Sequence, residues 1–446
     1  MRIALLGAVA LAATAGSAFA ASGWSPPHQL TGEHADAAVA ASNASGDAVA
    51  AWYRFQGDPE TISLHADSRQ RNGGFTSPVT LGAADLAIGG NPPSLPSVAV
   101  DDRGDAVLAW LRKDAAGNLR VEASYRPRHG HFGAAHQLSA AGAHAFQPMV
   151  AVDGRGDFTV VWQRFANGSF VVQEASRNRG QASFGAPTDV SVPGLDAEFP
   201  AVGVGAKGRI VVVWQARDSH AHTQFVQGAT REPHHAFGTP HALSNNTLDA
   251  SKPRLAVADD GSAMAAWDEG NAVSIGHVAA AFSRAGHGFG AEQVVTPAHV
   301  NQIGINAHVG IDRQGKATLV WLEIPAPGHT SLDYVRAATG NAAGHLVSTQ
   351  TLFHATAVIE PAIGVSSKGA AAASWVDLTA GSDPLYAAVR TRHATRFGHP
   401  AIVTDPGASA ATGVLAADAH SATAVWVASD GGVGRLGIET SRHALP

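Results

Sequence analysis

The sequence of 446 residues contains no cysteine, four tyrosines and three methionines. Without cysteine the chain forms no disulfide, binds no metal through thiolates and has no cysteine nucleophile, so its stability must come from packing and strand pairing. After the first twenty residues no stretch approaches the ~20 uninterrupted apolar residues of a membrane-spanning helix. We therefore expect a mature chain that inserts into no membrane.

Charged residues are also scarce, and their signs nearly balance. Lysine and arginine number 30 against 36 aspartates and glutamates, which gives a formal net charge of −6. This balance excludes the strongly basic character typical of proteins that bind nucleic acid or adsorb to anionic membranes. The sequence also lacks a nucleophile elbow, a phosphate-binding loop and a dinucleotide-binding fingerprint, so we expect no cofactor.

The first twenty residues, MRIALLGAVALAATAGSAFA, have the composition of a removable export signal. One early positive charge, Arg2, precedes an apolar run rich in alanine and leucine. Ala18-Phe19-Ala20 then provides the small-x-small pattern that signal peptidases cut. We expect cleavage after Ala20 and a mature protein in the periplasm or outside the cell.

The spacing of tryptophan reveals an internal repeat. Eight of the nine tryptophans recur at intervals of 51 to 58 residues: Trp52, Trp110, Trp162, Trp214, Trp267, Trp321, Trp375 and Trp426. Six positions before seven of them stands a glycine, while the eighth repeat has His420 there: Gly46, Gly104, Gly156, Gly208, Gly261, Gly315 and Gly369. A constant spacing from glycine to tryptophan predicts a constant tight turn, because glycine adopts positive φ without strain.

Each repeat divides into four short strands. Within residues 96–139, segments rich in valine, alanine and aromatic residues alternate with the turns DDRG, KDAAGN and PRHGH. Eleven positions before the tryptophan, the first strand carries a small residue in seven repeats: Ala41, Ala99, Ala151, Gly203, Ala256, Gly310 and Gly364. Small residues fit an innermost strand near the narrow axis of a ring. The eight four-stranded units predict an all-β, eight-bladed β-propeller that forms a single domain over residues 21–446.

The repeat count also predicts how the ring closes. In six repeats a phenylalanine opens the fourth strand, 22 or 23 residues after the tryptophan, whereas the sixth repeat has His345-Leu346 there: Phe75, Phe132, Phe184, Phe237, Phe289 and Phe397. The chain ends at Pro446, before the eighth repeat reaches this position. Near the N-terminus, GWSPPHQLTG aligns with the fourth strands of other repeats and places Trp24 in the phenylalanine position. We predict that this N-terminal strand completes the last blade and protects its edge.

The repeats, of the form VAVDDRGDAVLAW followed by RPRHGHFGAAHQLS, resemble those of secreted bacterial propeller proteins of the sialidase-like or BNR-repeat superfamily. The resemblance extends over nearly the whole mature chain and implies the propeller architecture. It implies no particular activity, because propellers include enzymes, lectins and docking scaffolds. The Asp-box pattern of sialidases is absent from the chain, and sialidases resemble six-bladed rings where this repeat count gives eight. The resemblance therefore identifies no catalytic residue.

Charges segregate among the repeats at one position of the second strand. Two residues after the tryptophan, repeats one to three carry arginine and repeats five to seven carry a carboxylate: Arg54, Arg112 and Arg164, then Glu269, Glu323 and Asp377. In one interpretation these residues form a polarised rim whose guanidinium groups hold an anionic ligand. In the other they are solvated charges at strand ends.

The segments that lead into the first strands supply a second candidate set. These residues are Gln147, Lys252, Asn306 and Glu360, with Arg254 and His308 two positions further on in their repeats. They differ between repeats while the framework is constant, and that contrast is typical of a recognition face. We expect them at the channel mouth, either as ligand-binding residues or as caps of strand ends.

Histidine is abundant, with 23 residues and the local pairs His129/His131, His220/His222 and His234/His235. The pairs are dispersed among repeats and lack the carboxylate spacing of a metal motif, so we predict no metal site from them.

Two further patterns are better explained by structure than by function. The Arg-Gly-Asp triplets at 103–105 and 155–157 contain the turn glycine of their repeats, and the surrounding turns lack the ligand series of calcium loops. Aspartate as a turn former explains them. Of the tyrosines, Tyr53 lies near the predicted rim, and we assign it no catalytic role.

Two classes of function follow. We favour a noncatalytic, exported propeller, a monomer, that recognises a glycan or a protein through its channel-mouth face. The alternative is a sialidase-like hydrolase or a lyase that acts on an anionic glycan with the rim arginines and carboxylates. Hydrolysis of a glycosidic bond requires two carboxylates about 5 to 10 Å apart.

Overall fold

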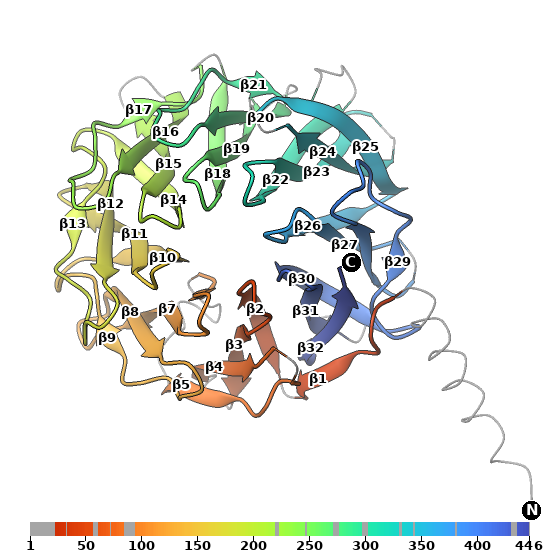
Figure 1. Cartoon of the computed structure of the whole chain (residues 1–446), viewed down its shortest axis with the longest axis horizontal. Helices are drawn as coiled ribbons and strands as arrows, with labels where there is room; N and C mark the ends of the chain where they lie inside the picture. Colours follow the sequence, from red (N-terminus) through yellow and green to blue (C-terminus); the bar gives the residue numbers. More distant parts are fainter. Residues whose placement is uncertain are drawn as a thin grey trace, which may run out of the picture.

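The computed structural model describes residues 23–445 apart from gaps at 33, 57–60, 72, 84–93, 219–222, 246–247, 271–275, 297–301, 330–331, 342–343, 380 and 430–434. The described residues form 32 strands, without a helix, in eight four-stranded sheets around a central axis (Figure 1). The predicted eight-bladed β-propeller is confirmed. The predicted export signal and the pair His220/His222 lie outside the described residues.

Every blade runs from an innermost first strand to an outermost fourth strand. Blade 1 contains β2 Ala35–Ser42, β3 Ala48–Gln56, β4 Thr61–Arg69 and β5 Val79–Ala83; blade 2 contains β6 Ser97–Val100, β7 Ala106–Lys113, β8 Leu119–Arg126 and β9 His136–Gln137. Blade 3 contains β10 Ala145–Val152, β11 Phe158–Ala166, β12 Ser169–Arg177 and β13 Thr188–Asp189; blade 4 contains β14 Asp196–Val204, β15 Ile210–Asp218, β16 Thr223–Arg231 and β17 His241–Ala242.

The second half of the ring repeats this order. Blade 5 contains β18 Asp249–Val257, β19 Ala263–Gly270, β20 Gly276–Ser283 and β21 Gln293–Val294; blade 6 contains β22 Gln302–Ile311, β23 Ala317–Pro325, β24 Asp333–Gly340 and β25 Leu346–Ala355. Blade 7 contains β26 Val358–Val365, β27 Ala371–Asp377, β28 Leu385–Arg390 and β29 Ala401–Ile402; blade 8 contains β30 Ser409–Ala417, β31 Ser421–Ser429, β32 Arg435–Ala444 and, from the N-terminus, β1 His28–Thr31.

The eight repeated tryptophans form the layers between blades, and each is at most 1% exposed. Trp267 of blade 5 packs in one cluster with Val213 and Val226 of blade 4. Trp375 of blade 7 does the same with residues of blade 6. Each indole thus joins its own blade to the preceding one, which is why the spacing of tryptophan reports the spacing of blades.

The turn between the first and second strands has the predicted geometry. The seven repeat glycines all have positive φ, between 77° and 94°. In blade 2 the carboxylate of Asp101 accepts hydrogen bonds from the backbone amides of Arg103 and Asp105, at 2.9 and 2.8 Å. Aspartate therefore acts as the turn former here. In blade 8, where His420 replaces glycine, Asp418 closes a shorter turn by accepting from His420 and Ser421.

Small residues on the first strands allow the inner strands to approach one another. A Cβ atom on Gly203 would lie 2.4 Å from Cγ2 of Val257 in the next blade, and one on Gly310 would lie 2.4 Å from Cγ2 of Val365. Such distances are far inside van der Waals contact. The predicted narrow axis therefore explains the small residues at this position.

The N-terminal strand closes the ring as predicted. β1 pairs antiparallel with β32, and the indole of Trp24, 3% exposed, packs edge-on against the ring of His443 at 5.3 Å. The amide of Ser25 donates to the carbonyl of Arg442 at 2.8 Å. The last blade is therefore built from both ends of the described chain.

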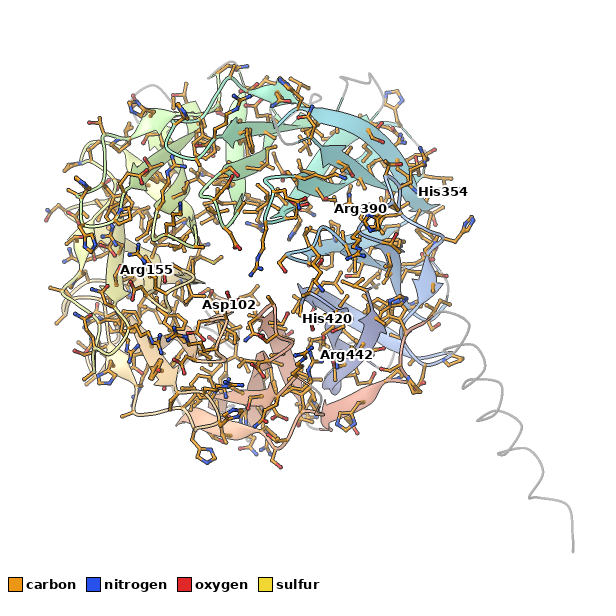
Figure 2. All side chains as sticks on the ribbon, in the orientation of Figure 1. Asp102, Arg155, His354, Arg390, His420 and Arg442 are labelled. Atoms are coloured by element: carbon orange, nitrogen blue, oxygen red, sulfur yellow. The ribbon has the colours of Figure 1, made fainter. Side chains whose placement is uncertain are left out.

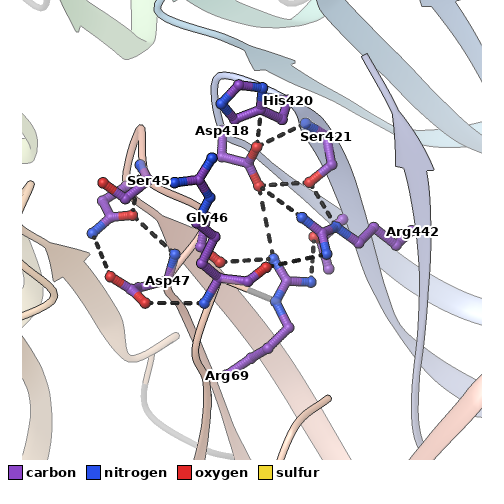
Figure 3. A network of polar contacts seen from close by, with 11 residues as sticks. Ser45, Gly46, Asp47, Arg69, Asp418, His420, Ser421 and Arg442 are labelled. Atoms are coloured by element: carbon purple, nitrogen blue, oxygen red, sulfur yellow. Dashed lines mark hydrogen bonds and ion pairs between the residues drawn. The ribbon is translucent and has the colours of Figure 1, made fainter. Parts of the chain in front are cut away.

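A buried polar network also joins blade 8 to blade 1 at the place where the ring closes, which we call the seam (Figure 3). Asp418 of blade 8 is 1% exposed and forms ion pairs with Arg69 of blade 1 at 3.8 Å and with Arg442 at 3.7 Å. Arg69 also donates to the hydroxyl of Thr423 at 3.0 Å. Because a buried carboxylate is stable only with such partners, the network specifies how blade 1 meets blade 8.

Candidate functional site

The first strands share a backbone irregularity at the end that opens onto the channel. Six blades carry a β-bulge with a non-glycine residue in the left-handed region, at φ between 51° and 59°: Ala37, Gln147, Phe199, Lys252, Asn306 and Glu360. Left-handed backbone costs a non-glycine residue about 1 kcal/mol or more and often accompanies functional sites. The bulge lies on the face that carries the loops between second and third strands, which we call the channel-mouth face.

Four of the six bulge residues belong to the set predicted from the sequence. Lys252, Asn306 and Glu360 have exposed side chains, and Gln147 is half-buried. The prediction that they bind a ligand is untested by this geometry, but the structure does place them at the mouth ends of the first strands of blades 3, 5, 6 and 7.

The residue directly after the repeat tryptophan holds three of these bulges in place. Oε1 of Gln163 accepts from the amide of Phe199 at 2.9 Å, and Oε1 of Gln215 accepts from the amide of Lys252 at 3.3 Å. Asp268 accepts from the amides of Asn306 and Ala307 at 3.0 and 3.2 Å. Each blade thereby orients the mouth residue of the next. The repeat pattern did not predict a role for this position, although it is polar in repeats three to five: Gln163, Gln215 and Asp268.

A charged group gathers where blades 5, 6 and 7 meet the channel. It comprises Arg254 and Asp268 of blade 5, His308 of blade 6 and Glu360 of blade 7. Burial lowers the pKa of Arg254, and the nearby carboxylates of Asp268 and Glu360 oppose that shift. Burial also raises the pKa of Asp268, against the hydrogen bonds from the amides of Asn306 and Ala307.

The imidazole of His308 is neutral at physiological pH. Burial, with a smaller contribution from the positive charge of Arg254, lowers the pKa of His308 from 6.5 to about 3. The mouth therefore presents a permanent cation beside an uncharged imidazole that can both donate and accept a hydrogen bond.

Blade 3 contributes an aromatic surface to the same face. The ring of Phe146 lies 5.9 Å from that of His144 and 6.0 Å from that of Phe170, and Phe170 lies 5.1 Å from Phe165. Phe165 is 41% exposed, and Met149 on the neighbouring first strand is 38% exposed. Clustered aromatic side chains left open to solvent on one surface are typical of ligand contact.

On the opposite face, a salt bridge crosses the axis. Arg313 of blade 6 pairs with Asp259 of blade 5 at 2.5 Å and with Asp102 of blade 2 at 3.8 Å. Asp102 lies at the inner margin of the ring (Figure 2). The ends of the first strands enclose a cavity of about 220 Å³ around this bridge. The bridge therefore spans the channel on this side.

The six predicted rim residues lie near the ends of the second strands on the channel-mouth side, and three of them are buried. Glu269, Glu323 and Asp377 are buried, at 2%, 4% and 5% exposure. Glu269 and Glu323 accept hydrogen bonds from the indoles of Trp267 and Trp321, at 2.9 and 3.4 Å. Because side chains alternate along a strand, a residue two positions after the tryptophan shares its side of the sheet, in the layer between blades.

Two of the other rim residues, Arg112 and Asp377, have partners in their own blades. Arg112 pairs with Glu122 at 3.6 Å and is half-exposed, and Asp377 accepts from the amide of Thr379 at 2.9 Å. Arg54 and Arg164 are half-buried at the ends of their strands. Ligand binding by the rim residues stays a prediction. The buried carboxylates of Glu269, Glu323 and Asp377 would have to rearrange before they could contact a ligand.

The histidine pairs that lie in the described residues flank grooves at the perimeter. His129 and His131 line a cavity of about 410 Å³ between blades 1 and 2, and His234 and His235 line one of about 380 Å³ between blades 3 and 4. Tyr53 is fully buried, and burial raises its pKa, so its phenol is remote from any exposed ligand.

Neither a protein-family model nor a curated protein sequence matches this chain. Among solved structures it is similar to the polysaccharide lyase Uly1, with 10% identity and a TM-score of 0.55 over 93% of this chain and 90% of that one. It is also similar to the lectin BP39L from Burkholderia pseudomallei, with 13% identity and a TM-score of 0.54 over 84% of this chain and 100% of the lectin. A PL25 ulvan lyase gives 11% identity and a TM-score of 0.51 over 94% of each chain. At such identity the likeness shows the fold: this chain is a β-propeller of the architecture shared by those lyases and that lectin.

Proposed function

We propose that this protein binds a glycan that carries carboxylate groups, through its channel-mouth face and without cleaving it. The observation that supports the proposal is the pairing of two surfaces around one mouth. Blade 3 offers the exposed aromatic ring of Phe165, and blades 5 to 7 offer Arg254, Lys252 and polar partners. Sugars present apolar ring faces to aromatic side chains, while their carboxylates suit guanidinium groups.

The similar solved structures support the glycan class. A lectin and two polysaccharide lyases share the fold over most of their length. Their identity to this chain, 10% to 13%, is too low to transfer any residue, so the proposed contacts come from this chain alone.

We also propose that the protein acts outside the cytoplasm as a monomer. The support is the N-terminal sequence of residues 1–20, with its single early charge, apolar run and Ala18-Phe19-Ala20. Among the described residues we find no helix long and apolar enough to span a membrane. N-terminal sequencing of protein from the periplasm and medium, and light scattering of the purified chain, test the two parts of this proposal.

The glycan proposal is tested by calorimetric binding to polyuronate oligosaccharides and to the same oligosaccharides with their carboxylates reduced. We expect binding of the acidic form alone, and a loss of at least tenfold in affinity for Arg254→Ala and Phe165→Ala. Arg128→Ala, at an exposed arginine of the other face, serves as the matched control and keeps wild-type affinity. Equal affinity of Arg254→Ala and wild type would refute the channel-mouth site.

The variants Arg112→Ala and Arg164→Ala distinguish glycan binding at the channel mouth from glycan binding at the predicted rim. If the mouth binds the glycan, both variants keep wild-type affinity within a factor of three. A larger loss in these two than in Arg254→Ala would move the site to the rim.

A lyase is the second candidate, because the neutral imidazole of His308 lies near the cation of Arg254. In a lyase a cation neutralises the uronate carboxylate while a base removes the adjacent proton. A pKa of about 3 makes His308 a weak base, and this favours binding over catalysis. Ultraviolet absorbance of unsaturated product, present in wild type and lost in His308→Gln, would establish the lyase instead.

A further inference from the structure

Blade 5 contains a group of three metal-ligating side chains that the channel site does not use. Glu269 of β19, His277 of β20 and Glu292, just before β21, bring one donor atom each to within 4.8 Å of one another. This is the only such group of three in the described part of the chain. It is separate from the histidine pairs noted in the sequence.

Hydrogen bonds within the trio and from neighbouring residues orient its carboxylates. Oε2 of Glu269 lies 2.8 Å from Nε2 of His277, and its Oε1 accepts from the indole of Trp267 at 2.9 Å. The two oxygens of Glu292 accept from the amide and the side chain of Asn245 in blade 4, at 2.8 and 2.9 Å. Each oxygen keeps a lone pair for a cation. Outer partners of this kind are typical of metal ligands.

Charge compensation distinguishes this group from the other buried glutamates. Glu323 pairs with Arg336 at 2.9 Å, and Glu174 pairs with Arg231 at 2.5 Å. The side chain of Glu269 is 1% exposed, yet its only ion-pair partner among the described residues is His277, and a second carboxylate adjoins it. Burying a carboxylate is costly without compensating charge, and where blades 4 and 6 supply arginine, blade 5 supplies only the imidazole of His277.

We propose that Glu269, His277 and Glu292 bind one divalent transition-metal ion, for which zinc is the natural probe. One imidazole nitrogen and two carboxylate oxygens, at about 2.0 to 2.2 Å from the ion, suit zinc, and water reaches the fourth position beside the half-buried Glu292. The ion replaces the contact between Glu269 and His277. It ties the three outer strands of blade 5 together and, through Asn245, ties them to blade 4, so its role is structural.

Zinc titration of chelator-treated protein tests the proposal by calorimetry and thermal melting. We expect one stoichiometric site, a rise in melting temperature with zinc, and a loss of at least about tenfold in affinity for Glu292→Gln and His277→Gln, because each removes a direct ligand. The control is the double variant His129→Gln/His131→Gln, which removes surface imidazoles and keeps the tight site.

Because Glu292 is half-buried, metal-free Glu292→Gln should melt at the same temperature as metal-free wild type. This variant therefore decides the test even if His277→Gln folds poorly. Wild-type affinity in folded Glu292→Gln would overturn the proposal. So would wild-type protein that neither binds zinc stoichiometrically nor melts higher with it, because the trio would then share only a proton.

Discussion

At the scale of single residues, neighbours along one strand have different roles because their side chains alternate between two sides of the sheet. Trp267 and Glu269 point into the layer shared with blade 4, whereas Asp268 reaches the backbone of blade 6 at the channel mouth. A shift of one position thus separates a buried structural carboxylate from a carboxylate of the candidate site.

His308 should make stability depend on pH. Its pKa is lowered from 6.5 to about 3, so between these values the unfolded chain carries a proton at this residue that the folded protein does not. The contribution to the free energy of unfolding is therefore fully present above pH 6.5 and falls as the pH drops from 6.5 towards 3. Urea unfolding at several pH values should show a shallower decline in His308→Gln.

The control for His308 is His345→Gln, because His345 is exposed. That variant should follow the wild-type curve. A decline in His308→Gln as steep as that of the wild type would contradict the neutral imidazole.

Gly310 tests the packing around the axis. Its missing Cβ would lie 2.4 Å from Val365, so Gly310→Ala should lower the free energy of unfolding by about 1 to 3 kcal/mol. Gly288→Ala is the matched control, since a Cβ atom there would have no neighbour within 4 Å and the φ of Gly288 is not left-handed. Equal denaturant midpoints for the two variants would show that the inner strands do not crowd as described.

At the scale of elements, the first strand is the part of each blade that carries both packing and recognition. Its hairpin end crowds the axis with small residues, and its mouth end carries the bulge with a left-handed residue in six blades. A bulge re-aims the side chain that it carries. The repeated strain is consistent with a site that these strands present.

A substitution at Lys252 tests whether its left-handed backbone is strained and whether its side chain binds the glycan. Glycine adopts positive φ freely, so Lys252→Gly should raise the free energy of unfolding by up to about 1 kcal/mol while weakening binding of an acidic glycan. Lys207→Gly, at an exposed lysine outside the left-handed region, should show neither effect. Chemical unfolding and calorimetry on both variants check this, and a destabilised Lys252→Gly would mean that the bulge is unstrained.

At the scale of the whole molecule, the ring depends on contacts between residues far apart in the chain. β1 pairs with β32, Asp418 pairs with Arg69, and Arg313 joins blades 2, 5 and 6 across the axis. An open ring would expose the edge of β32 and the layer in which Trp52 of blade 1 packs against blade 8. Stability of the eight blades should therefore be coupled through the seam.

Removal of the N-terminal strand tests this coupling. A chain that begins at residue 32 loses Trp24 and β1, and loss of one buried tryptophan alone costs about 3 to 5 kcal/mol. We expect a melting temperature at least about three degrees below that of a chain beginning at residue 21, because an unfolding entropy of about 2 cal/mol/K per residue converts such a loss into a shift of this size in a chain of this length. Unaltered melting of the shortened chain would refute closure by β1.

The sequence alone determined the number of blades, the turn glycines, the small inner residues and the strand exchange that closes the ring. These features repeat within each unit and depend on local geometry, so the spacing of Trp52 to Trp426 and the missing fourth strand after Trp426 suffice to predict them. It also identified the set from Gln147 to Glu360 at the first strands, because these residues vary while the framework does not.

Only the tertiary structure decided which charges meet. Their spacing from the repeat tryptophan assigned Glu269, Glu323 and Arg112 to the same predicted rim. The fold instead buries Glu269 and Glu323 beside their tryptophans. The grouping of Arg254, Asp268 and His308, and the bridge from Arg313 to Asp102, join different blades. Such contacts depend on the closure and curvature of the whole ring, which the repeat inside a single blade does not encode.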